Sequence, residues 1–216
     1  MMIPLPVDIP PAIDPFLEWL DLAGVAVFAL SGALVAAGKR LTLVTFIFFA
    51  VITGIGGGTA RDLLIGAPVF WIHENATLLI CLAAALAVWV LPPRSWKGTA
   101  LLWCDAAGMA AFAAYGASKG LTFGIAPLPA IGMGVLTACL GGIIRDVLAG
   151  QPSILMRSEL YVTPAALSAS LLVGLSLAGL PGVVAVPIAA IAGFSLRAGA
   201  LLWGWKLPAY GRRETT

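Results

Sequence analysis

Charged residues are scarce in this sequence. Of its 216 residues, 12 are Lys or Arg and 10 are Asp or Glu, together 10%, whereas a soluble domain carries roughly 25%. So few charges exclude an ordinary soluble enzyme, because its surface must be coated with polar side chains. They also exclude a disordered chain, which combines high charge with few apolar residues. The net charge of +2 is too small to indicate a nucleic-acid partner.

Residues suited to metal or redox chemistry are equally few. The sequence has one histidine, His73, and its three cysteines, Cys81, Cys104 and Cys139, lie in apolar stretches where small packing residues are expected. No motif supplies a metal cluster, a nucleophile with its base, or a pair of converging carboxylates. We therefore expect no catalytic residue, no bound metal and no cofactor, and we predict that the protein is not an enzyme.

Apolar residues make up 61% of the chain and lie in long runs. At roughly 20 apolar residues for each crossing of a bilayer, the chain has room for about seven helices and little else. We expect an all-α polytopic membrane protein with a single transmembrane domain. Its helices are predicted at about 16–38, 41–65, 76–91, 99–117, 125–148, 164–180 and 183–205.

Basic residues are distributed unevenly over the expected loops. Eight fall on the side that holds the C-terminus and the loops after the first, third and fifth helices: Lys39, Arg40, Arg94, Lys97, Arg157, Lys206, Arg212 and Arg213. On the opposite side, only Lys119 is expected to be exposed. By the positive-inside rule, this distribution predicts an N-terminus outside and a cytoplasmic C-terminus.

The sequence repeats itself at an offset of 84 residues, so that position 21 aligns with position 105. DLAGVAVFALSGA at 21–33 aligns with DAAGMAAFAAYGA at 105–117, and TGIGGGTARDLLIGAP at 53–68 aligns with TACLGGIIRDVLAGQP at 137–152. Two copies of a three-helix unit, at about 16–92 and 99–180, are therefore followed by an extra helix at about 183–205. Because three is odd, the copies enter the membrane from opposite faces, which predicts the inverted repeats described for many transporters.

Glycines interrupt the second and fifth expected helices at matching places. Successive glycines weaken a helix and uncover its carbonyls, and a bilayer tolerates such a break only where it faces protein or water. We interpret the paired breaks as the lining of an ion pathway, formed by Thr53, Gly56, Gly57, Gly58, Thr137, Gly141 and Gly142. The alternative is close helix packing, which the G-x-x-x-G of Gly54 and Gly58 would also explain.

Each repeat also carries an Arg-Asp pair inside its second helix, where a charge needs a partner or water. Because neighbouring residues on a helix point about 100° apart, Arg61 and Asp62 are not expected to pair with each other. Matching depths instead predict the ion pairs Asp21–Arg61 and Asp105–Arg145. We expect these charges to support the pore helices, with direct ion handling as the alternative. The residues assigned to this role are Asp21, Arg61, Asp62, Asp105, Arg145 and Asp146.

Isolated polar residues inside other helices are less informative. Ser31 and Tyr115 could offer hydroxyl oxygens to a pathway, although single hydroxyls more often pack helices together. Arg197, in the last helix, is expected to extend towards the cytoplasmic face or to pair at a contact between subunits.

The doubled motif resembles a known family. G-G-G-x-x-R-D in the second helix and G-G-x-x-R-D in the fifth, within seven helices and two repeats, are similar to the prokaryotic branch of the trimeric intracellular cation (TRIC) channels. The resemblance covers nearly the whole chain. It implies a homotrimer in the lipid bilayer of a prokaryotic plasma (inner) membrane, with a pore for potassium and other monovalent cations in each protomer. The Lys-Glu-Val segment of the animal members is absent, so their regulation by phosphoinositides is not implied.

Two functions are compatible with this sequence. Inverted repeats are commonest in carriers, so the residues alone favour a secondary carrier of a small solute such as a small neutral amino acid. The resemblance favours a channel. Our main prediction is a potassium-permeable channel whose pore is lined by the second and fifth helices, and the carrier is the alternative.

Overall fold

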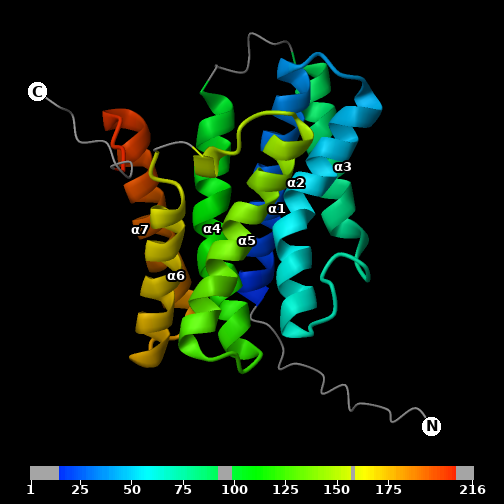
Figure 1. Cartoon of the computed structure of the whole chain (residues 1–216). Coiled ribbons are helices and arrows are strands. Elements are labelled where there is room, and N and C mark those ends of the chain that lie inside the picture. Colours follow the sequence, from blue (N-terminus) through cyan, green and yellow to red (C-terminus); the bar gives the residue numbers. More distant parts are fainter. Residues whose placement is uncertain (1–14, 92–98, 157–158, 208–216) are drawn as a thin grey trace, which may run out of the picture.

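The computed structural model describes residues 15–91, 99–156 and 159–207 (Figure 1). The described residues form seven α-helices, as the sequence predicts. They are α1 (Pro15–Gly38), α2 (Leu43–Ile65), α3 (Asn75–Val90), α4 (Ala100–Thr122), α5 (Pro127–Leu148), α6 (Val162–Leu177) and α7 (Gly182–Trp203), with a short 3-10 helix, η2 (Ile154–Met156), before α6. The expected all-α membrane fold is confirmed.

Five of the described helices, α1, α2, α4, α5 and α7, are long and apolar enough to cross a bilayer. α3 and α6 are also apolar but have 16 residues each. At 1.5 Å per residue they reach about 24 Å, short of the roughly 30 Å hydrocarbon core. Both are the third helix of a repeat, so their shortness is a property of the repeated unit.

Successive helices run in alternate directions (Figure 1). The loop after α1, which holds Lys39 and Arg40, lies at the same end of the molecule as the end of α7, and α1 begins at the opposite end. Side chains buried mainly between α1, α2 and α3 form one part of the core. A second part lies between α4, α6 and α7 and consists largely of alanine.

Residues that align in the two repeats contact each other across the interface between α1 and α4. The rings of Phe28 and Phe112 are stacked with their centroids 5.2 Å apart. A Cβ added to Gly24 would run into Phe112, and one added to Gly108 would run into Phe28. Such reciprocal contacts are what a twofold axis between the repeats requires.

Neither α2 nor α5 is broken at its glycines, so the expected helix breaks are wrong. Both helices run without interruption through residues 56–58 and 141–142. The glycines instead allow two backbones to meet: a Cβ on Gly57 would run into the carbonyl of Thr137, and a Cβ on Gly141 into that of Thr53. An intact helix keeps its carbonyls hydrogen-bonded, which apolar surroundings favour strongly. Close packing, the alternative interpretation, accounts for Gly57 and Gly141.

We expect Gly141→Ala to destabilise the protein, because its Cβ would lie 2.5 Å from the carbonyl oxygen of Thr53. Overpacking of this kind costs roughly 1–3 kcal/mol, which thermal unfolding in detergent would detect. Gly174→Ala in α6 is the matched control, since its Cβ would meet nothing within 4 Å and alanine is the better helix former. Equal unfolding temperatures for the two variants would contradict the packing role of Gly141.

Candidate functional site

Two clusters of polar residues are buried at corresponding places in the two repeats. The Arg61 cluster consists of Asp21, Arg61, Asp62 and Lys119, and the Arg145 cluster consists of Ser31, Asp105, Arg145 and Asp146. Every member is at most 6% exposed. Burying a charge to this degree costs several kcal/mol unless partners compensate it, so the partners of these residues identify the site.

Within each cluster the arginine bonds the aspartate that follows it in the sequence. Nε of Arg61 donates to Oδ1 of Asp62 at 2.8 Å, and Nε of Arg145 donates to Oδ1 of Asp146 at 2.9 Å. The expectation that such neighbours would not pair is therefore wrong. The arginine side chain is long enough to fold back along its own helix, so the angle between the two Cβ directions does not keep the groups apart.

Each of these aspartates also holds the loop that follows its helix. Oδ2 of Asp62 accepts a hydrogen bond from the backbone of Phe70 at 3.1 Å, and Oδ2 of Asp146 accepts one from Ile154 at 3.0 Å. The chain can return because α2 ends at Gly66, with φ +68°, in the left-handed conformation that favours glycine. The two loops thus cover the two arginine clusters in the same way.

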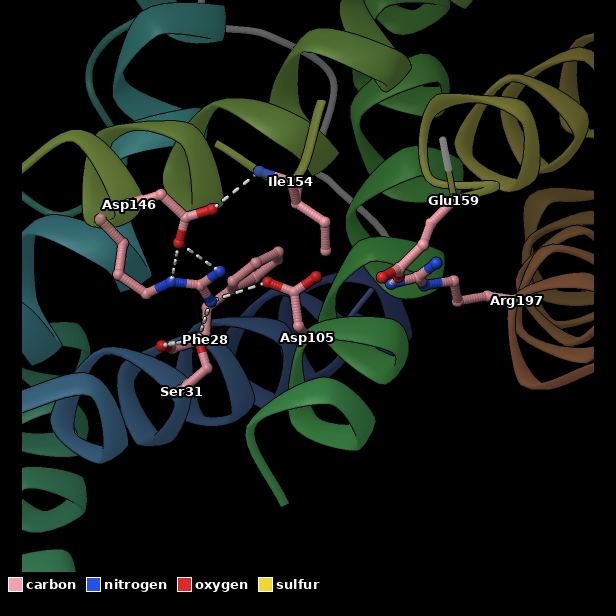
Figure 2. A network of polar contacts seen from close by, with 8 residues as sticks. Phe28, Ser31, Asp105, Asp146, Ile154, Glu159 and Arg197 are labelled. Carbon is pink, nitrogen blue, oxygen red and sulfur yellow. Dashed lines mark hydrogen bonds and ion pairs between the residues drawn. The ribbon is translucent and has the colours of Figure 1, made fainter. Parts of the chain in front are cut away.

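The predicted pair Asp105–Arg145 is confirmed (Figure 2). Nη1 of Arg145 donates to Oδ1 of Asp105 at 2.8 Å and also to Oγ of Ser31 at 2.9 Å. Nη2 of Arg145 lies 2.9 Å from Oδ1 of Asp146. Since Ser31 belongs to α1, the arginine of the second repeat is anchored on the first repeat.

The predicted pair Asp21–Arg61 does not form. The guanidinium carbon of Arg61 instead lies 4.9 Å from the ring centroid of Tyr115 and 5.9 Å from that of Phe70, distances at which cation–π attraction operates. Oδ1 of Asp62 also forms an ion pair with Nζ of Lys119 at 2.9 Å. Within the described part of the chain, Nη1 and Nη2 of Arg61 and Oδ1 of Asp21 are buried without a hydrogen-bond partner.

Lys119 was missed as a member of the site because the sequence predicts an end near 117 for its helix. α4 continues to Thr122, so Lys119 lies inside the helix and is buried rather than exposed. Ser31 and Tyr115, in contrast, carried a usable signal. They align with each other in the repeat, and each contacts the arginine of the opposite repeat.

The α2–α5 crossing lies between the two clusters. Thr53, Gly57 and Arg61 follow at intervals of four on one face of α2, as their counterparts do on α5. Because Gly57 meets Thr137 and Gly141 meets Thr53, the arginines fall beyond the crossing at opposite ends. The hydroxyl of Thr53 is buried and has no partner among the described residues, whereas that of Thr137 donates to the Met133 carbonyl at 2.6 Å.

The other glycines of the motif have different neighbours: Gly58 lies against the loop after α2, Gly142 against Tyr161 and α4, and Gly56 against α5. A Cβ on Gly58 would lie 2.7 Å from the Phe70 ring, and one on Gly142 would lie 2.9 Å from the Tyr161 hydroxyl and 3.3 Å from Asp105. A Cβ on Gly56 would meet Ile144 at 3.2 Å. The structure thus brings the predicted residues of α2 and α5 together, although through packing rather than through helix breaks.

Arg197 of α7 fixes the loop beside the Arg145 cluster (Figure 2). It is fully buried, its Nη1 donates to the Leu160 carbonyl at 2.7 Å, and its Nη2 lies 3.2 Å from Oε2 of Glu159. Its guanidinium carbon lies 5.4 Å from the ring centroid of Tyr161. Arg197 therefore pairs within its own chain and does not extend to the membrane face. No group of three or more potential metal ligands occurs in the described residues.

We expect Asp105→Asn to lower the free energy of unfolding by about 1–3 kcal/mol or more, because Arg145 loses a charged partner in buried surroundings. Adding Arg145→Gln should recover part of this loss, since residues in contact have non-additive effects. Thermal unfolding of the single and double variants in detergent measures the coupling.

Asp21→Asn is the matched control from the first repeat. Oδ1 of Asp21 has no partner in the described ranges, so the substitution should cost much less than Asp105→Asn, because it removes a buried charge without breaking an ion pair that Arg61 forms there. An equally large loss in Asp21→Asn, or strict additivity of the changes at 105 and 145, would contradict the assignment.

Known proteins match this chain over most of its length. A family model described as "Glycine transporter" matches the chain twice, at residues 18–93 and 102–176. The chain is 34% identical over 207 residues to the UPF0126 inner membrane protein YadS of Escherichia coli K12, covering 91% of this chain and 97% of YadS. It is 37% identical over 208 residues to a UPF0126 membrane protein of Vibrio cholerae, covering 94% of this chain and 87% of that protein.

Two solved structures have the same fold. The TRIC trimeric intracellular cation channel orthologue from Rhodobacter sphaeroides is 40% identical to this chain and superposes with a TM-score of 0.82. The match covers 89% of this chain and 100% of the orthologue's chain. A prokaryotic TRIC channel crystallised in 0.5 M KCl is 27% identical, with a TM-score of 0.80 over 89% of this chain and 98% of its own.

Proposed function

We propose that this protein is a potassium-permeable channel for monovalent cations. The chain belongs to the prokaryotic branch of the TRIC channel family. The resemblance found in the doubled Arg-Asp motif is confirmed. The observation that carries the proposal is the likeness to the channel orthologue from Rhodobacter sphaeroides, which extends over 89% of this chain. The structural neighbours are ion channels, which also supports a function other than catalysis.

The proposed pathway runs inside each protomer along the facing surfaces of α2 and α5, from the Arg61 cluster to the Arg145 cluster. Its narrowest part is the crossing, where Gly57 and Gly141 lie against carbonyl groups. Because this contact leaves no room for a side chain, conduction requires α2 and α5 to move apart there. Hydroxyl and carbonyl dipoles, such as those of Thr53 and Thr137, would then replace part of the water around the ion.

The charges at one end of this pathway favour cations. The Arg145 cluster combines one guanidinium with two carboxylates, Asp105 and Asp146, so its formal charge is negative when both are ionised. A negative site in low-dielectric surroundings attracts cations and repels anions over several ångströms. We expect exclusion of anions and weak discrimination between potassium and sodium.

Assembly and orientation are further parts of the proposal. A homotrimer follows from family membership, since the solved relative from Rhodobacter sphaeroides is a trimeric channel. An outer N-terminus and a cytoplasmic C-terminus follow from the positive-inside rule. Lys119 was the one basic residue expected to be exposed on the side of the N-terminus, and it is buried. The difference in exposed basic residues between the two sides is therefore larger than the sequence predicts.

A second candidate function is transport of a small neutral amino acid. It is favoured by one specific observation, the two matches to a family model described as "Glycine transporter". The inverted repeats suit a carrier as well as a channel. The two candidates differ in rate, since an open pore passes many ions for each opening whereas a carrier moves its solute in single turnovers.

Purified protein in a planar bilayer tests the proposal directly. Under a KCl gradient we expect discrete openings and a reversal potential whose sign reports cation selectivity, from protein that native mass measurement identifies as a trimer. Absence of openings, combined with saturable glycine uptake into vesicles that contain the same preparation, would replace the channel by the carrier.

A further inference from the structure

The side chain of Tyr161 covers the Arg145 cluster. Tyr161 directly precedes α6, yet it is only 1% exposed. A Cβ added to Gly142 of α5 would lie 2.9 Å from the Tyr161 hydroxyl. The same point lies 3.3 Å from Oδ1 of Asp105 and 3.6 Å from Nη2 of Arg145. The tyrosine hydroxyl is therefore placed against α5 beside the ion pair of the cluster, where the proposed pathway ends.

Arg197 fastens this segment to α7. Its Nη1 donates to the Leu160 carbonyl at 2.7 Å, and its Nη2 lies 3.2 Å from Oε2 of Glu159 (Figure 2). Its guanidinium carbon is 5.4 Å from the ring centroid of Tyr161, within the range of cation–π attraction. Lys206, which follows α7, also forms an isolated antiparallel bridge with Glu159. Three consecutive residues, 159–161, are thus held from the side of α7.

The hydroxyl end of Tyr161 is held much less firmly. Among the residues that the structure describes, this hydroxyl is buried and has no hydrogen-bond partner. Moving the ring away from Gly142 would therefore break no hydrogen bond of the Arg145 cluster, but it would break contacts with Arg197. A side chain that is held on one side only is suited to move between two positions.

Helix packing alone does not account for Arg197. It is the one charged residue within α7 (Gly182–Trp203), and it is fully buried. Burial of a guanidinium group in a membrane helix is costly even with partners, and an apolar side chain of similar size would avoid that cost. Since α7 lies outside the two repeats, its arginine acts on one of the two clusters only.

We propose that Arg197 is a positioning residue for gating: it holds Tyr161 over the Arg145 end of the pathway, and conduction requires the tyrosine to move away. The inference rests on the proposed channel function and adds the group that closes one end of the pathway. The Tyr161 side chain and the crossing at Gly57 and Gly141 would then be two closures in series. It also gives α7, the helix added to the repeats, a role in regulation.

Single-channel recording of the purified full-length protein in a planar bilayer tests this role. Arg197→Gln should raise the ratio of open to closed time about tenfold, because charged contacts that favour the closed position are lost. The current through one open channel should stay the same, since the described contacts of Arg197 are with residues 159–161 and not with α2 or α5. Arg197→Lys keeps the charge and should give a smaller increase.

The matched control is Phe194→Leu, on the same helix. The Phe194 ring packs against Trp103 of α4, with the centroids 6.2 Å apart. This variant disturbs the packing of α7 without touching the contacts of Arg197, so its ratio of open to closed time should equal that of the wild type.

A double variant separates positioning from a structural role. Tyr161→Ala removes the closing side chain and should raise the open-to-closed ratio at least as much as Arg197→Gln. Adding Arg197→Gln to Tyr161→Ala should then change nothing further, because the arginine acts through the tyrosine. If Arg197→Gln does not fold, Glu159→Gln takes its place in the same cycle, since Glu159 is partly exposed and contacts Arg197.

Four outcomes decide between the possibilities. A lower unfolding temperature of Arg197→Gln with an unchanged open-to-closed ratio would overturn the inference, and so would independent effects of the changes at 161 and 197. The same ratio in the wild type and in Tyr161→Ala would overturn it while leaving the channel intact. Absence of openings in the wild type and in every variant would instead refute the channel itself.

Discussion

The contact between α2 and α5 constrains the rest of the structure. At this crossing a carbonyl oxygen of each helix occupies the place that a side chain would take on the other, so positions 57 and 141 must be glycine. Because the repeats are inverted, the contact occurs twice, once at Gly57 and once at Gly141. The two contacts together fix the distance between α2 and α5 and their position along each other's axis. That depth places Arg61 and Arg145 one helical turn beyond the crossing, at opposite ends of the protomer.

The buried arginines in turn connect the helices to their loops and to the opposite repeat. Each arginine bonds the next aspartate, and that aspartate holds the loop that covers the cluster. Ser31 and Tyr115 link each arginine to the repeat to which it does not belong. The clusters then diverge, because Lys119 enters the first and Asp105 binds within the second. One becomes formally neutral and the other negative, so two copies of one unit would present different chemistry to the proposed pathway.

Much of this arrangement follows from the sequence, and the exceptions have physical causes. The number of helices follows from the length of the hydrophobic runs. The ion pair Asp105–Arg145 follows from the matching depths of the two residues, which the alignment of the repeats gives. The continuity of α2 could not be inferred from its glycines, because apolar surroundings penalise an unpaired carbonyl more than a glycine weakens a helix. The hydrogen bond from Arg61 to Asp62 depends on the conformation of the arginine side chain. The burial of Lys119 depends on α4 extending five residues beyond its predicted end, to Thr122. Neither leaves a trace in spacing or composition.

The central claim is that ions pass between α2 and α5 at the level of Thr53. Cysteine accessibility during current recording tests it most directly, using Thr53→Cys in a chain whose Cys81, Cys104 and Cys139 are replaced by alanine. The account predicts that a small charged thiol reagent modifies position 53 while the protein conducts, and that current falls in proportion to the modified fraction measured by mass. An unreactive position 53 in conducting protein, or full modification with unchanged current, would contradict it.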